Sequence, residues 1–533
     1  MQATIKKDEK AILVSNGKII YLDYKNPEDL QFVREAYGYE AEEKGWFRER
    51  DQLFVFSGAL TLNTAKTKLR GQAPPSILDV PAPPKPDGPV SQKLFAMDDG
   101  SIMRWIRHPS ALPKSSRKHW RNHTALFELT GKNPDFVCYT SIHSFGVIDG
   151  GDGKFRIIGP GGIRWINYPN KAAAISDALD MSLAVAMKIQ VVQTPSAGNK
   201  VTVFGDISNK PKVLTSIFAA FERLGFIVTS ADLGLSLDDL EKYALPVAPT
   251  SLVPMGVYKN GIPSALVTAD ACLPAVEAMA QSLPDSPPLN KIIVSIQGIG
   301  EVGYLLAQYL IEKGAKVIIA ETNTQTKSRF KKENSSAFSS NQAEFLKDPD
   351  KIYDVPADIF CPCALRDILD EHNLSRLLKA GVRIIGGPAN NLFPDQIEGP
   401  WLFHKAGIPV VPYEGIGAGG VTGVAYSVMS GIFGECPFTI AEKIELIKNY
   451  VAKVLKWSQR YDLPPQVISD RILFRSIKRR NLFGQQKADL MLEELRRAFK
   501  GSNRDFEDAL VKEYTKKGFF YGPGRHRVIK SGL

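Results

Sequence analysis

Cysteine is scarce in this chain, with five residues among 533. The number is odd and most of the five stand inside apolar runs, which excludes a disulfide framework as the basis of the fold. Cys361-Pro-Cys363 stands within the apolar run Ala357–Leu365 and lacks the two-residue spacing of redox or metal-binding thiols. We therefore expect buried structural cysteines and no metal site.

Long apolar runs are missing as well. No window approaches the roughly 20 apolar residues of a membrane-spanning helix, and the N-terminal sequence MQATIKKDEK carries no apolar signal segment. These absences predict a cytoplasmic protein without a membrane partner. The hydrophobic content of 44% is enough, at this length, for two or three domains with ordinary cores.

The sequence also lacks the pattern of a nucleic-acid-binding module. The formal net charge is +10, but the segment Arg471–Leu533 holds 16 Lys and Arg against 7 Asp and Glu, so most of the excess is C-terminal. Its basic clusters, Lys478-Arg479-Arg480 and Arg496-Arg497, lie on segments of helical pattern that are interleaved with acids. Solvated helix faces explain them, and we expect no nucleic-acid partner.

What the chain does contain begins with a small α+β unit. In Lys10–Asp23 the dipeptide Asn16-Gly17 separates two apolar alternating runs, which is the strongest short signal of a β-hairpin. A helix over Pro27–Tyr37 and a strand at Leu53–Phe56 follow. The proline-rich stretch Ala73–Val90 then predicts a semi-rigid linker, because proline continues neither a helix nor a central strand.

The segment Lys291–Asn323 reads as strand, glycine turn, helix and strand in one continuous unit. The turn is Gly298-x-Gly300-x-x-Gly303. Its first glycine permits the tight turn, the second lets the backbone approach a pyrophosphate, and the third lets the helix pack on the strand. The sequence therefore predicts a Rossmann-type dinucleotide site. The alternative for the motif alone is a glycine turn that merely closes a βαβ unit.

An acidic residue completes this unit. Glu321 ends the second strand, 23 residues after Gly298. A carboxylate at this distance hydrogen-bonds the adenosine ribose hydroxyls, which favours NAD over NADP as the cofactor. Glu301 and Val302, which open the helix, belong to the same predicted cofactor site.

Two lysines and an aspartate stand upstream in a distinctive order. Lys188 follows a helical pattern over Lys171–Met187, Lys200 comes twelve residues later at the head of a strand, and Asp232 lies in the turn Ala231–Gly234. Either lysine alone would be read as a surface charge. Joined to a downstream dinucleotide unit, this spacing resembles the glutamate/leucine/phenylalanine/valine dehydrogenase family, with leucine dehydrogenase the best-matching member. Further matching runs are Gly159–Arg164, Val201–Asp206, Val267–Ala269, Gln297–Gly303, Asp358–Leu365 and Ala418–Val421.

The resemblance implies a role for each of these residues. Lys188 would pair with the substrate α-carboxylate, Lys200 would polarise the carbonyl or carbinolamine oxygen and activate water, and Asp232 would move a proton to and from the amine nitrogen. Thr268 would help to hold the nicotinamide carboxamide, and Asn390 would lie beside the nicotinamide ribose. The implied reaction is the oxidative deamination of an amino acid with NAD in a homo-oligomeric enzyme whose two domains close over a cleft.

The resemblance also implies an α/β fold in which a Rossmann-type dinucleotide-binding domain accompanies an α/β substrate domain. We expect residues 1–90 to be an N-terminal α+β extension with its linker. Residues 91–268 would then form the substrate and oligomerisation domain, and residues 269–423 the NAD-binding domain. Residues 424–533 would be C-terminal helices that return to the substrate domain. We expect the N-terminal extension to fold as a separate appendage.

The substrate class follows from a missing charge. Glutamate enzymes of the family place a lysine before the Gly-Gly pair to hold the substrate side-chain carboxylate, whereas Pro160 precedes Gly161 and Gly162 here. A serine of the glutamate enzymes corresponds to Val424, three residues after Val421. These residues predict an apolar side-chain pocket, which rejects glutamate because its carboxylate would lie unpaired. The alternative at Pro160, Val421 and Val424 is an ordinary core residue.

The chain departs from the family at three places near this site, one of which is the run Lys188–Thr194 in place of the family's K-N-A-A-A-G-L. Ala197-Gly198-Asn199 replaces three glycines before Lys200, and Gly417 replaces an asparagine. These changes are compatible with a reshaped substrate pocket or with weakened chemistry. Our leading hypothesis is an NAD-dependent dehydrogenase of an apolar or aromatic amino acid. The rival is a non-catalytic NAD sensor on the same fold, and a glutamate dehydrogenase is disfavoured by Pro160 and Val424.

Overall fold

The computed structural model describes residues 10–15, 18–23, 25–37, 46–49, 52–56, 93–97, 99–106, 109–120, 123, 125–132, 134–143, 147–149, 155–194, 196–224, 226–248, 262–433, 436 and 438–477. The turn Asn16-Gly17, the linker Ala73–Val90 and the basic clusters beyond residue 477 lie outside these residues. Contacts divide the chain into two compact units. The first unit joins residues 1–80, 268–419 and 444–475, and the second joins residues 81–267, 420–443 and 476–533.

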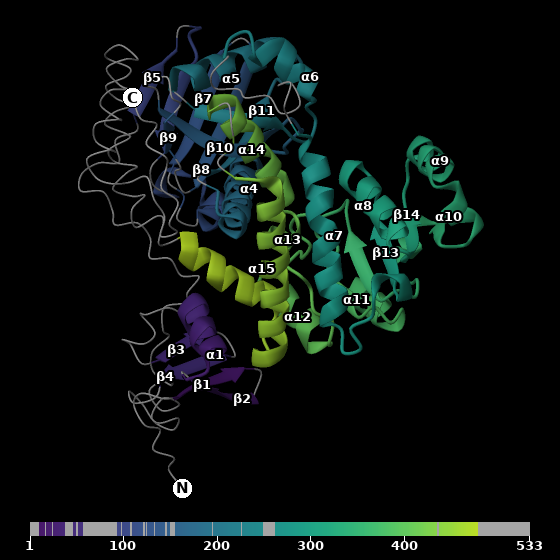
Figure 1. Cartoon of the computed structure of the whole chain (residues 1–533). Helices are drawn as coiled ribbons and strands as arrows, with labels where there is room; N and C mark the ends of the chain where they lie inside the picture. Colours follow the sequence, from purple (N-terminus) through teal and green to yellow (C-terminus); the bar gives the residue numbers. More distant parts are fainter. Residues whose placement is uncertain are drawn as a thin grey trace. The chain divides into compact units, whose positions relative to one another are not determined.

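The first unit contains a five-stranded parallel sheet in the order β15-β14-β13-β16-β17. Helices α7 and α8 lie beside its strands in Figure 1. Parallel strands joined through helices form the Rossmann-type architecture that the sequence predicts, so this expectation is confirmed. The strands are β13 Ile293–Gln297, β14 Lys316–Ala320, β15 Ala343–Phe345, β16 Ile359–Pro362 and β17 Ile384–Ile385, and the helices are α7 Ser264–Ser282, α8 Glu301–Glu312, α9 Thr324–Glu333, α10 Ser335–Ser339, α11 Glu371–Lys379, α12 Gly399–Lys405 and α13 Tyr413–Ile416.

The core of this sheet comes from the apolar runs that predicted its strands. Val294, Ile296, Val317 and Ile319 are fully buried and pack in one cluster with α7 and α8. Gly314 ends α8 with a φ of 85°, a left-handed conformation that glycine adopts without a steric cost. Strand, turn, helix and strand therefore follow one another in the predicted order.

The second unit contains an eight-stranded mixed sheet in the order β12-β10-β11-β8-β7-β6-β5, with β9 paired to β10. β10 runs parallel to β11 and β12, whereas the ladder from β11 through β5 is antiparallel. The strands are β5 Lys93–Ala96, β6 Ile102–Ile106, β7 Ala125–Lys132, β8 Asp135–His143, β9 Val147–Asp149, β10 Phe155–Arg164, β11 Gly198–Gly205 and β12 Phe226–Ala231, and the helices are α4 Lys171–Val192, α5 Lys210–Leu224, α6 Leu237–Asp239 and α14 Gly419–Phe433.

Helices cover both faces of this sheet. Alternate residues of β8 divide between two apolar clusters, since Cys138 packs with α5 whereas Val137 and Tyr139 pack with α4. This alternation is the period of two that a strand imposes on its side chains. A strand buried on both faces explains the unbroken apolar stretch Phe136–Tyr139 within β8.

The long helix α4 differs from its predicted bounds at one end. Asn170 caps its start, because the side-chain oxygen of Asn170 accepts a hydrogen bond of 2.9 Å from the Ala173 backbone N–H. We predicted an end at Met187, but α4 continues to Val192 because Ile189, Val191 and Val192 are all buried. Lys188 therefore lies within α4 rather than after it.

The N-terminal residues form a four-stranded antiparallel sheet in the order β2-β1-β4-β3. Helix α1 follows β2 in the sequence. The predicted hairpin is confirmed by the pairing of Ser15 with Lys18 at its end. Asn26 caps α1 by accepting a hydrogen bond from the Glu28 N–H, and Pro27 opens the helix. The elements are β1 Lys10–Ser15, β2 Lys18–Asp23, α1 Pro27–Phe32, β3 Trp46–Glu49 and β4 Gln52–Phe56.

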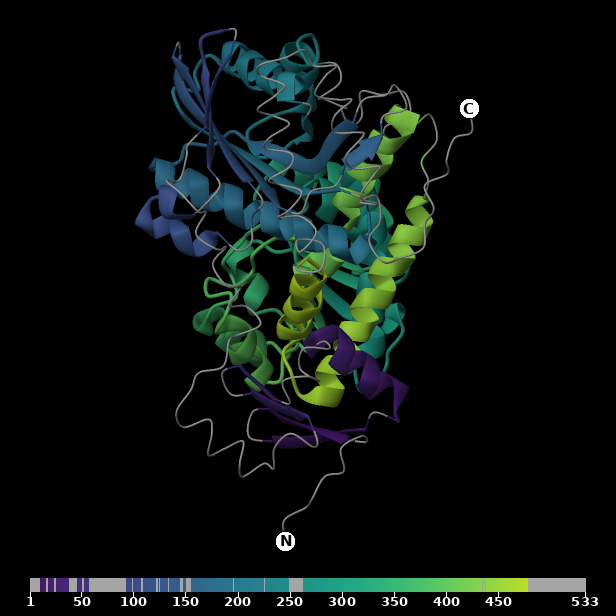
Figure 2. The same ribbon diagram turned by 90° about the vertical axis from the view of Figure 1, so that its left-hand side faces the viewer.

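This N-terminal part is not a separate appendage. In Figures 1 and 2, α1 lies against the C-terminal end of helix α15, Ile440–Tyr461. The buried carboxylate of Asp29 accepts hydrogen bonds from the Arg460 guanidinium and, at 2.8 Å, from the Tyr461 hydroxyl. Phe32 stacks on Tyr461 with ring centroids 3.7 Å apart. The expectation of a detached appendage is wrong, because Asp29 and Phe32 have their partners on α15. Independent folding of the N-terminal part stays a prediction.

The C-terminal helices also differ from the prediction. Val451 and Leu455 of α15 pack in the core of the parallel sheet, and residues 444–475 belong to the first unit. The predicted return of residues 424–533 to the substrate domain is therefore wrong for this stretch, although α14 belongs to the second unit. An amphipathic pattern shows that α15 buries one face, but it does not show what that face packs against.

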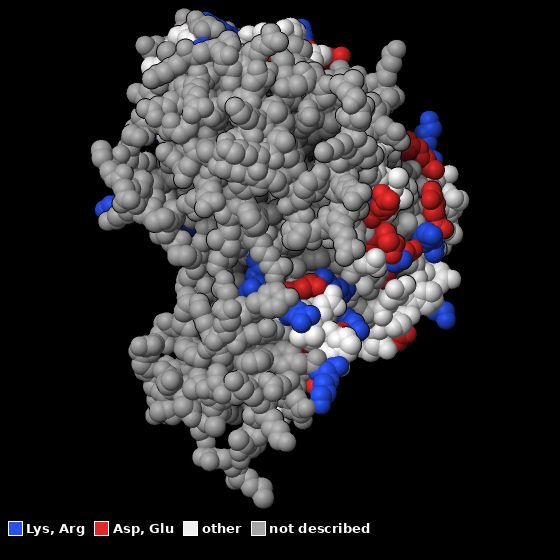
Figure 3. All heavy atoms as spheres, turned by 60° about the vertical axis from the view of Figure 1, so that its left-hand side comes forward, with Lys and Arg blue, Asp and Glu red and all other residues white. Residues whose placement is uncertain are grey.

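The cysteines, helices and surface charges of the described residues bear on disulfides, metal sites, membranes and nucleic acids. None of the five cysteines forms a disulfide. Among the described residues, no helix is long and apolar enough to cross a membrane, and no three or more His, Cys, Asp or Glu side chains gather as metal ligands would. Figure 3 shows the described Lys and Arg side chains interspersed with Asp and Glu over the visible part of one face.

Replacing Phe32 with alanine tests the docking of α1. Phe32 is fully buried between Tyr461, Trp457 and Tyr37. We expect Phe32→Ala to lower the free energy of unfolding by about 3 kcal/mol, the usual cost of deleting a buried aromatic ring. Urea titration followed by circular dichroism measures it, with the exposed neighbour changed in Gln31→Ala as the control. Equal midpoints for the two variants would contradict the docking.

Candidate active site

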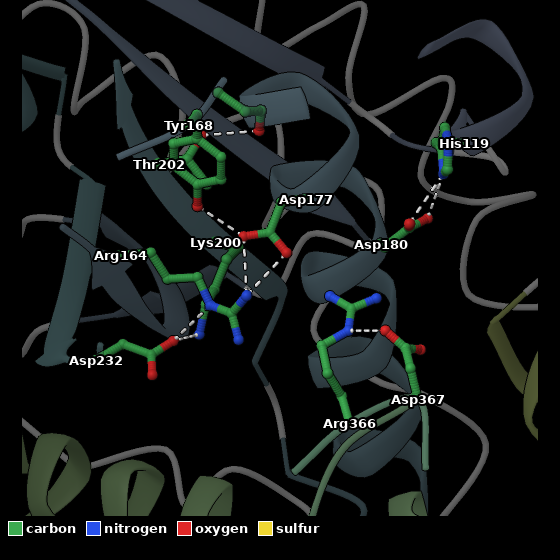
Figure 4. A network of polar contacts seen from close by, with 11 residues as sticks. His119, Arg164, Tyr168, Asp177, Asp180, Lys200, Thr202, Asp232, Arg366 and Asp367 are labelled. Atoms are coloured by element: carbon green, nitrogen blue, oxygen red, sulfur yellow. Dashed lines mark hydrogen bonds and ion pairs between the residues drawn. The ribbon is translucent and has the colours of Figure 1, made fainter. Parts of the chain in front are cut away.

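The second unit brings Lys200 and Asp232 together. Lys200 is the third residue of β11, and Asp232 follows the end of β12, on the two strands that flank β10. The Lys200 ammonium forms an ion pair with Oδ2 of Asp232. Both side chains are largely buried, with exposed fractions of 10% and 26%. Residues 32 positions apart in the sequence thus form a charged pair at one end of the sheet (Figure 4).

A third charge joins this pair from β10. The Nε of Arg164 donates to Oδ2 of Asp232 at 3.2 Å, so two cations share one carboxylate oxygen. The Nη1 of the same guanidinium donates to both oxygens of Asp177 on α4, at 2.8 and 2.9 Å. The Tyr168 hydroxyl donates to Oδ2 of Asp177 at 2.7 Å. Figure 4 shows these five side chains as one connected network.

The pKa values follow from this arrangement. Burial alone would raise the pKa of Asp232, but Lys200 and then Arg164 outweigh it and lower that pKa to about 2. For Arg164, burial opposes the charged form while Asp177 and Asp232 raise its pKa above the ordinary value. Asp232 is therefore an anion over the whole physiological pH range, and it is charge-paired on two sides.

The glycine pair of β10 makes room for these groups. A Cβ at Gly161 would collide with the backbone oxygen of Asn199, and one at Gly162 would lie 2.7 Å from the Cβ of Asp232. Both positions therefore require glycine for β10 to approach the strand that carries Lys200 and the turn that carries Asp232. The pairing of β10 with β12 shifts register between Gly159 and Gly162, at the position of Pro160, whose side chain lies outside the described residues.

The altered loop before Lys200 keeps its essential glycine. A Cβ at Gly198 would lie 2.6 Å from the Cβ of Ala186, so glycine allows β11 to lie close to α4, the helix that also carries Lys188. Asn199 fits because its side chain turns elsewhere and donates to the Ser141 carbonyl at 3.3 Å. The departure from three glycines therefore leaves the Lys200 strand in contact with α4.

The remaining predicted substrate residues lie on helices of the second unit. Lys188 is a partly exposed residue of α4. Val421 and Val424 lie one turn apart on α14, and both are buried, with exposed fractions of 6% and 5%. Gly417, which replaces the family's asparagine, donates its backbone N–H to the Tyr413 carbonyl at 2.7 Å, next to α14.

The glycine turn of the first unit fits a dinucleotide. Gly298 has a φ of 86°, and a Cβ at Gly300 would meet nothing within 4 Å, which leaves open space at the start of α8. A Cβ at Gly303 would collide with the Gly298 carbonyl, so this glycine is needed for the turn to close. The N-cap residue of α8, Gly300, has no side chain to cap the first backbone N–H groups, where Glu301 and Val302 lie, so it leaves them to a pyrophosphate.

The acidic residue of this turn is held in place by backbone groups. Oε2 of Glu321 accepts a hydrogen bond from the Ile299 N–H at 2.9 Å, and Oε1 accepts from the N–H groups of Thr322 and Asn323, each at 2.8 Å. Glu321 is thereby fixed beside the glycine turn. Thr268 is a buried residue of α7, and Asn390 follows β17 beside Asn391, which has a left-handed φ of 52°.

Two residues of the charged network were not anticipated. Asp177 and Tyr168 had no assigned role, and Arg164 was noted only as part of a matching run. A signal was present for Arg164, because Gly162 and Arg164 are two apart on one strand and so point to the same side, toward Asp232. No pattern in the sequence connects Asp177 to Arg164, since their contact depends on how α4 packs on the sheet.

Comparison with known proteins agrees with this architecture. The family model of glutamate/leucine/phenylalanine/valine dehydrogenases matches residues 264–464. Leucine dehydrogenase of Thermoactinomyces intermedius is 30% identical over 351 residues, which cover 63% of this chain and 89% of that enzyme. L-tryptophan dehydrogenase of Nostoc punctiforme is 28% identical over 320 residues, covering 59% of this chain and 83% of the relative.

A solved structure supports the fold. The crystal structure of L-tryptophan dehydrogenase from Nostoc punctiforme matches with a TM-score of 0.54 at 22% sequence identity, covering 69% of this chain and 99% of that one. The matched sequence spans nearly all of the leucine dehydrogenase, so the likeness is not confined to the dinucleotide motif. The chain therefore belongs to the glutamate/leucine/phenylalanine/valine dehydrogenase family and is an amino-acid dehydrogenase, an oxidoreductase that acts on CH–NH2 groups.

Proposed function

We propose that this protein catalyses the NAD-dependent oxidative deamination of an apolar or aromatic L-amino acid to its 2-oxo acid and ammonium, and the reverse reaction. The observation that carries the proposal is the buried Lys200–Asp232 pair beside Gly161 and Gly162, in a chain of this family. An acid–base pair of this kind suits a reaction that moves protons at an amine nitrogen and at an attacking water.

The overall reaction sets the demands on these residues. The amino acid loses a hydride from Cα to the nicotinamide ring and a proton from nitrogen, and water then replaces the nitrogen as ammonium. Lys188 supplies a fixed cation for the α-carboxylate, which orients Cα. Asp232 exchanges the proton at the amine nitrogen. Lys200, once it turns from Asp232, stabilises the developing charge on the carbinolamine oxygen and directs the water.

The substrate class follows from the side-chain pocket. Pro160 stands where a glutamate enzyme has a lysine, and Val424 and Val421 present a buried apolar face on α14. A substrate carboxylate beside them would be desolvated without a partner, at a cost of several kcal/mol. The relatives named above, a leucine dehydrogenase and an L-tryptophan dehydrogenase, are consistent with an apolar or aromatic side chain.

The choice of NAD follows from Glu321. Three backbone N–H groups fix its carboxylate beside the glycine turn, where the adenosine ribose of a bound dinucleotide lies. A 2′-phosphate there would face a fixed negative charge. A homo-oligomer remains our proposal for the assembly, on the strength of the family resemblance.

A substrate screen tests the proposed reaction. Apolar, aromatic and acidic amino acids are mixed with NAD, and their 2-oxo acids with NADH and ammonium, while absorbance at the NADH band is followed. We expect turnover with at least one apolar or aromatic substrate, and much less with glutamate because of Pro160 and Val424. Preference for glutamate would contradict the pocket, and NAD binding without any turnover would favour the sensor.

Single substitutions separate the two lysines. We expect Lys200→Ala to lower kcat by about 10²- to 10⁴-fold with unchanged NAD affinity, the range for a lost acid–base group. Lys188→Ala should instead raise the amino-acid KM by about 10- to 100-fold, because it removes a charged hydrogen bond to the carboxylate. Steady-state kinetics measures both, with Lys210→Ala, which breaks the peripheral 3.0 Å pair with Asp239, as the control. Small, equal effects of the two changes would refute these roles.

Replacing Glu321 with glutamine tests cofactor choice. The amide keeps the size and an oxygen for the Ile299 N–H but removes the charge. We expect the wild type to prefer NAD over NADP in kcat/KM, and Glu321→Gln to reduce that preference by about tenfold or more, which corresponds to one lost charge repulsion. The matched control is Glu312→Gln at the other end of α8. A wild type with equal kcat/KM for both cofactors would refute the assignment.

A further inference from the structure

The ion pair between Lys200 and Asp232 opposes the proposed role of Lys200. Lys200 is paired with Asp232 in this structure, yet its proposed task requires the ammonium to turn toward the substrate. If Lys200 were the sole partner of Asp232, that turn would leave a largely buried carboxylate unpaired. Such a state is strongly disfavoured, and it would hold Lys200 away from the reaction.

Arg164 removes this difficulty by its geometry. Its Nε reaches Asp232 at 3.2 Å while its Nη1 is held by both oxygens of Asp177. The guanidinium is planar and rigid, so a group anchored at one edge presents the other edge in a fixed position. Its side chain is only 12% exposed, and that of Asp177 is 11% exposed. The anchor is therefore protected from water and from competing ions.

The anchor itself is held from a second side. Tyr168 donates to Oδ2 of Asp177 at 2.7 Å, so Asp177 accepts from both Arg164 and Tyr168. Burial and the negative charge of Asp177 raise the pKa of Tyr168 far above its usual value, so its hydroxyl keeps the proton that it donates. Arg164 is thus linked to α4 and to the loop after β10, neither of which carries Lys200.

We propose that Arg164 is a positioning residue that holds the Asp232 carboxylate, through its anchors Asp177 and Tyr168, so that Lys200 can turn to the substrate without leaving Asp232 unpaired. This inference rests on the proposed function, because it presupposes the roles of Lys200 and Asp232. Among the described residues, the charged and titratable side chains recorded around Asp232 are Lys200 from β11, Arg164 from β10, Asp177 from α4 and Tyr168. Arg164 is the member of this set that bridges the two carboxylates.

The central test is Arg164→Ala with rescue by added guanidinium. We expect kcat to fall about a hundredfold, the size of effect produced by misplacing a reacting group, while the KM for NAD and for the amino acid changes little. Guanidinium chloride, at concentrations far below those that denature, should fill the vacated site and restore part of kcat. A loss of kcat that guanidinium does not relieve, or a change confined to KM, would overturn the proposal.

A matched control comes from another ion pair of the same sheet. Arg104 of β6 pairs with Glu128 of β7 at 2.8 Å, with exposed fractions of 26% and 15%, away from Lys200 and Asp232 in the strand order. Arg104→Ala should leave kcat unchanged and show no response to guanidinium. An equal loss of kcat in Arg104→Ala would show that Arg164 serves only the general stability of the sheet, and would overturn the proposal.

Three further variants test the proposal if Arg164→Ala does not fold. Asp177→Asn and Tyr168→Phe each remove part of the anchor while the guanidinium stays in place. Each should lower kcat with little change in KM, and Arg164→Lys should be only partly active, because one ammonium cannot bridge two carboxylates as the guanidinium does. Wild-type kcat in both anchor variants would overturn the proposal.

A stability measurement separates this proposal from the proposed function. Thermal unfolding midpoints are compared for Arg164→Ala, Asp232→Asn and the double variant at neutral pH. If Arg164 holds Asp232, the double variant loses less than the two single losses combined. Additive losses would overturn the positioning role even in an active enzyme. Absence of turnover in the wild type, with coupled losses, would overturn the reaction while the Arg164–Asp232 link stands.

Discussion

One carboxylate shared by two cations organises the candidate active site of this protein. Asp232 comes from the turn after β12, Lys200 from β11 and Arg164 from β10. One ionic contact therefore joins side chains from three neighbouring strands. The strands can meet this closely because Gly161 and Gly162 have no side chains to separate them. Burial makes the contact specific, since each charge would be costly without its partners.

The second unit carries the buried charged side chains of the candidate site, whereas the first unit carries the glycine turn that fits a dinucleotide. In the first unit Gly298 turns with a positive φ, Gly300 leaves open space, and the start of α8 offers uncapped N–H groups. Both devices use glycine, but for different reasons. In the second unit glycine allows strands to approach one another, and in the first it lets the backbone face a ligand.

Local patterns predicted much of this arrangement. The Rossmann-type turn, α8, the hairpin and the placement of Lys200 and Asp232 next to strand ends all follow from residue type and spacing. The family resemblance assigned Lys200 and Asp232 to one catalytic site, but their ion pair was not predicted. The end of α4 was missed because burial of Ile189, Val191 and Val192 prolongs a helix that β-branched residues disfavour.

Contacts between residues far apart in the sequence could not be predicted from local patterns. Nothing in the sequence near Asp29 indicates Arg460 or Tyr461, more than 400 residues away, as its partners, so the N-terminal part looked independent. The anchoring of Arg164 by Asp177 was missed for the same reason. Periodicity shows which face of an element is buried, and only the fold shows which residues meet there.

In the proposed reaction, hydride passes directly from the α-carbon of an apolar amino acid to NAD. This transfer is tested by giving the enzyme its active amino acid deuterated at Cα. The reduced cofactor is then analysed for deuterium by mass spectrometry. We expect NADH that carries the deuterium, together with a slower rate than with the protiated substrate if hydride transfer limits turnover. Reduced cofactor without deuterium would contradict it, because the hydride would then have come from another source.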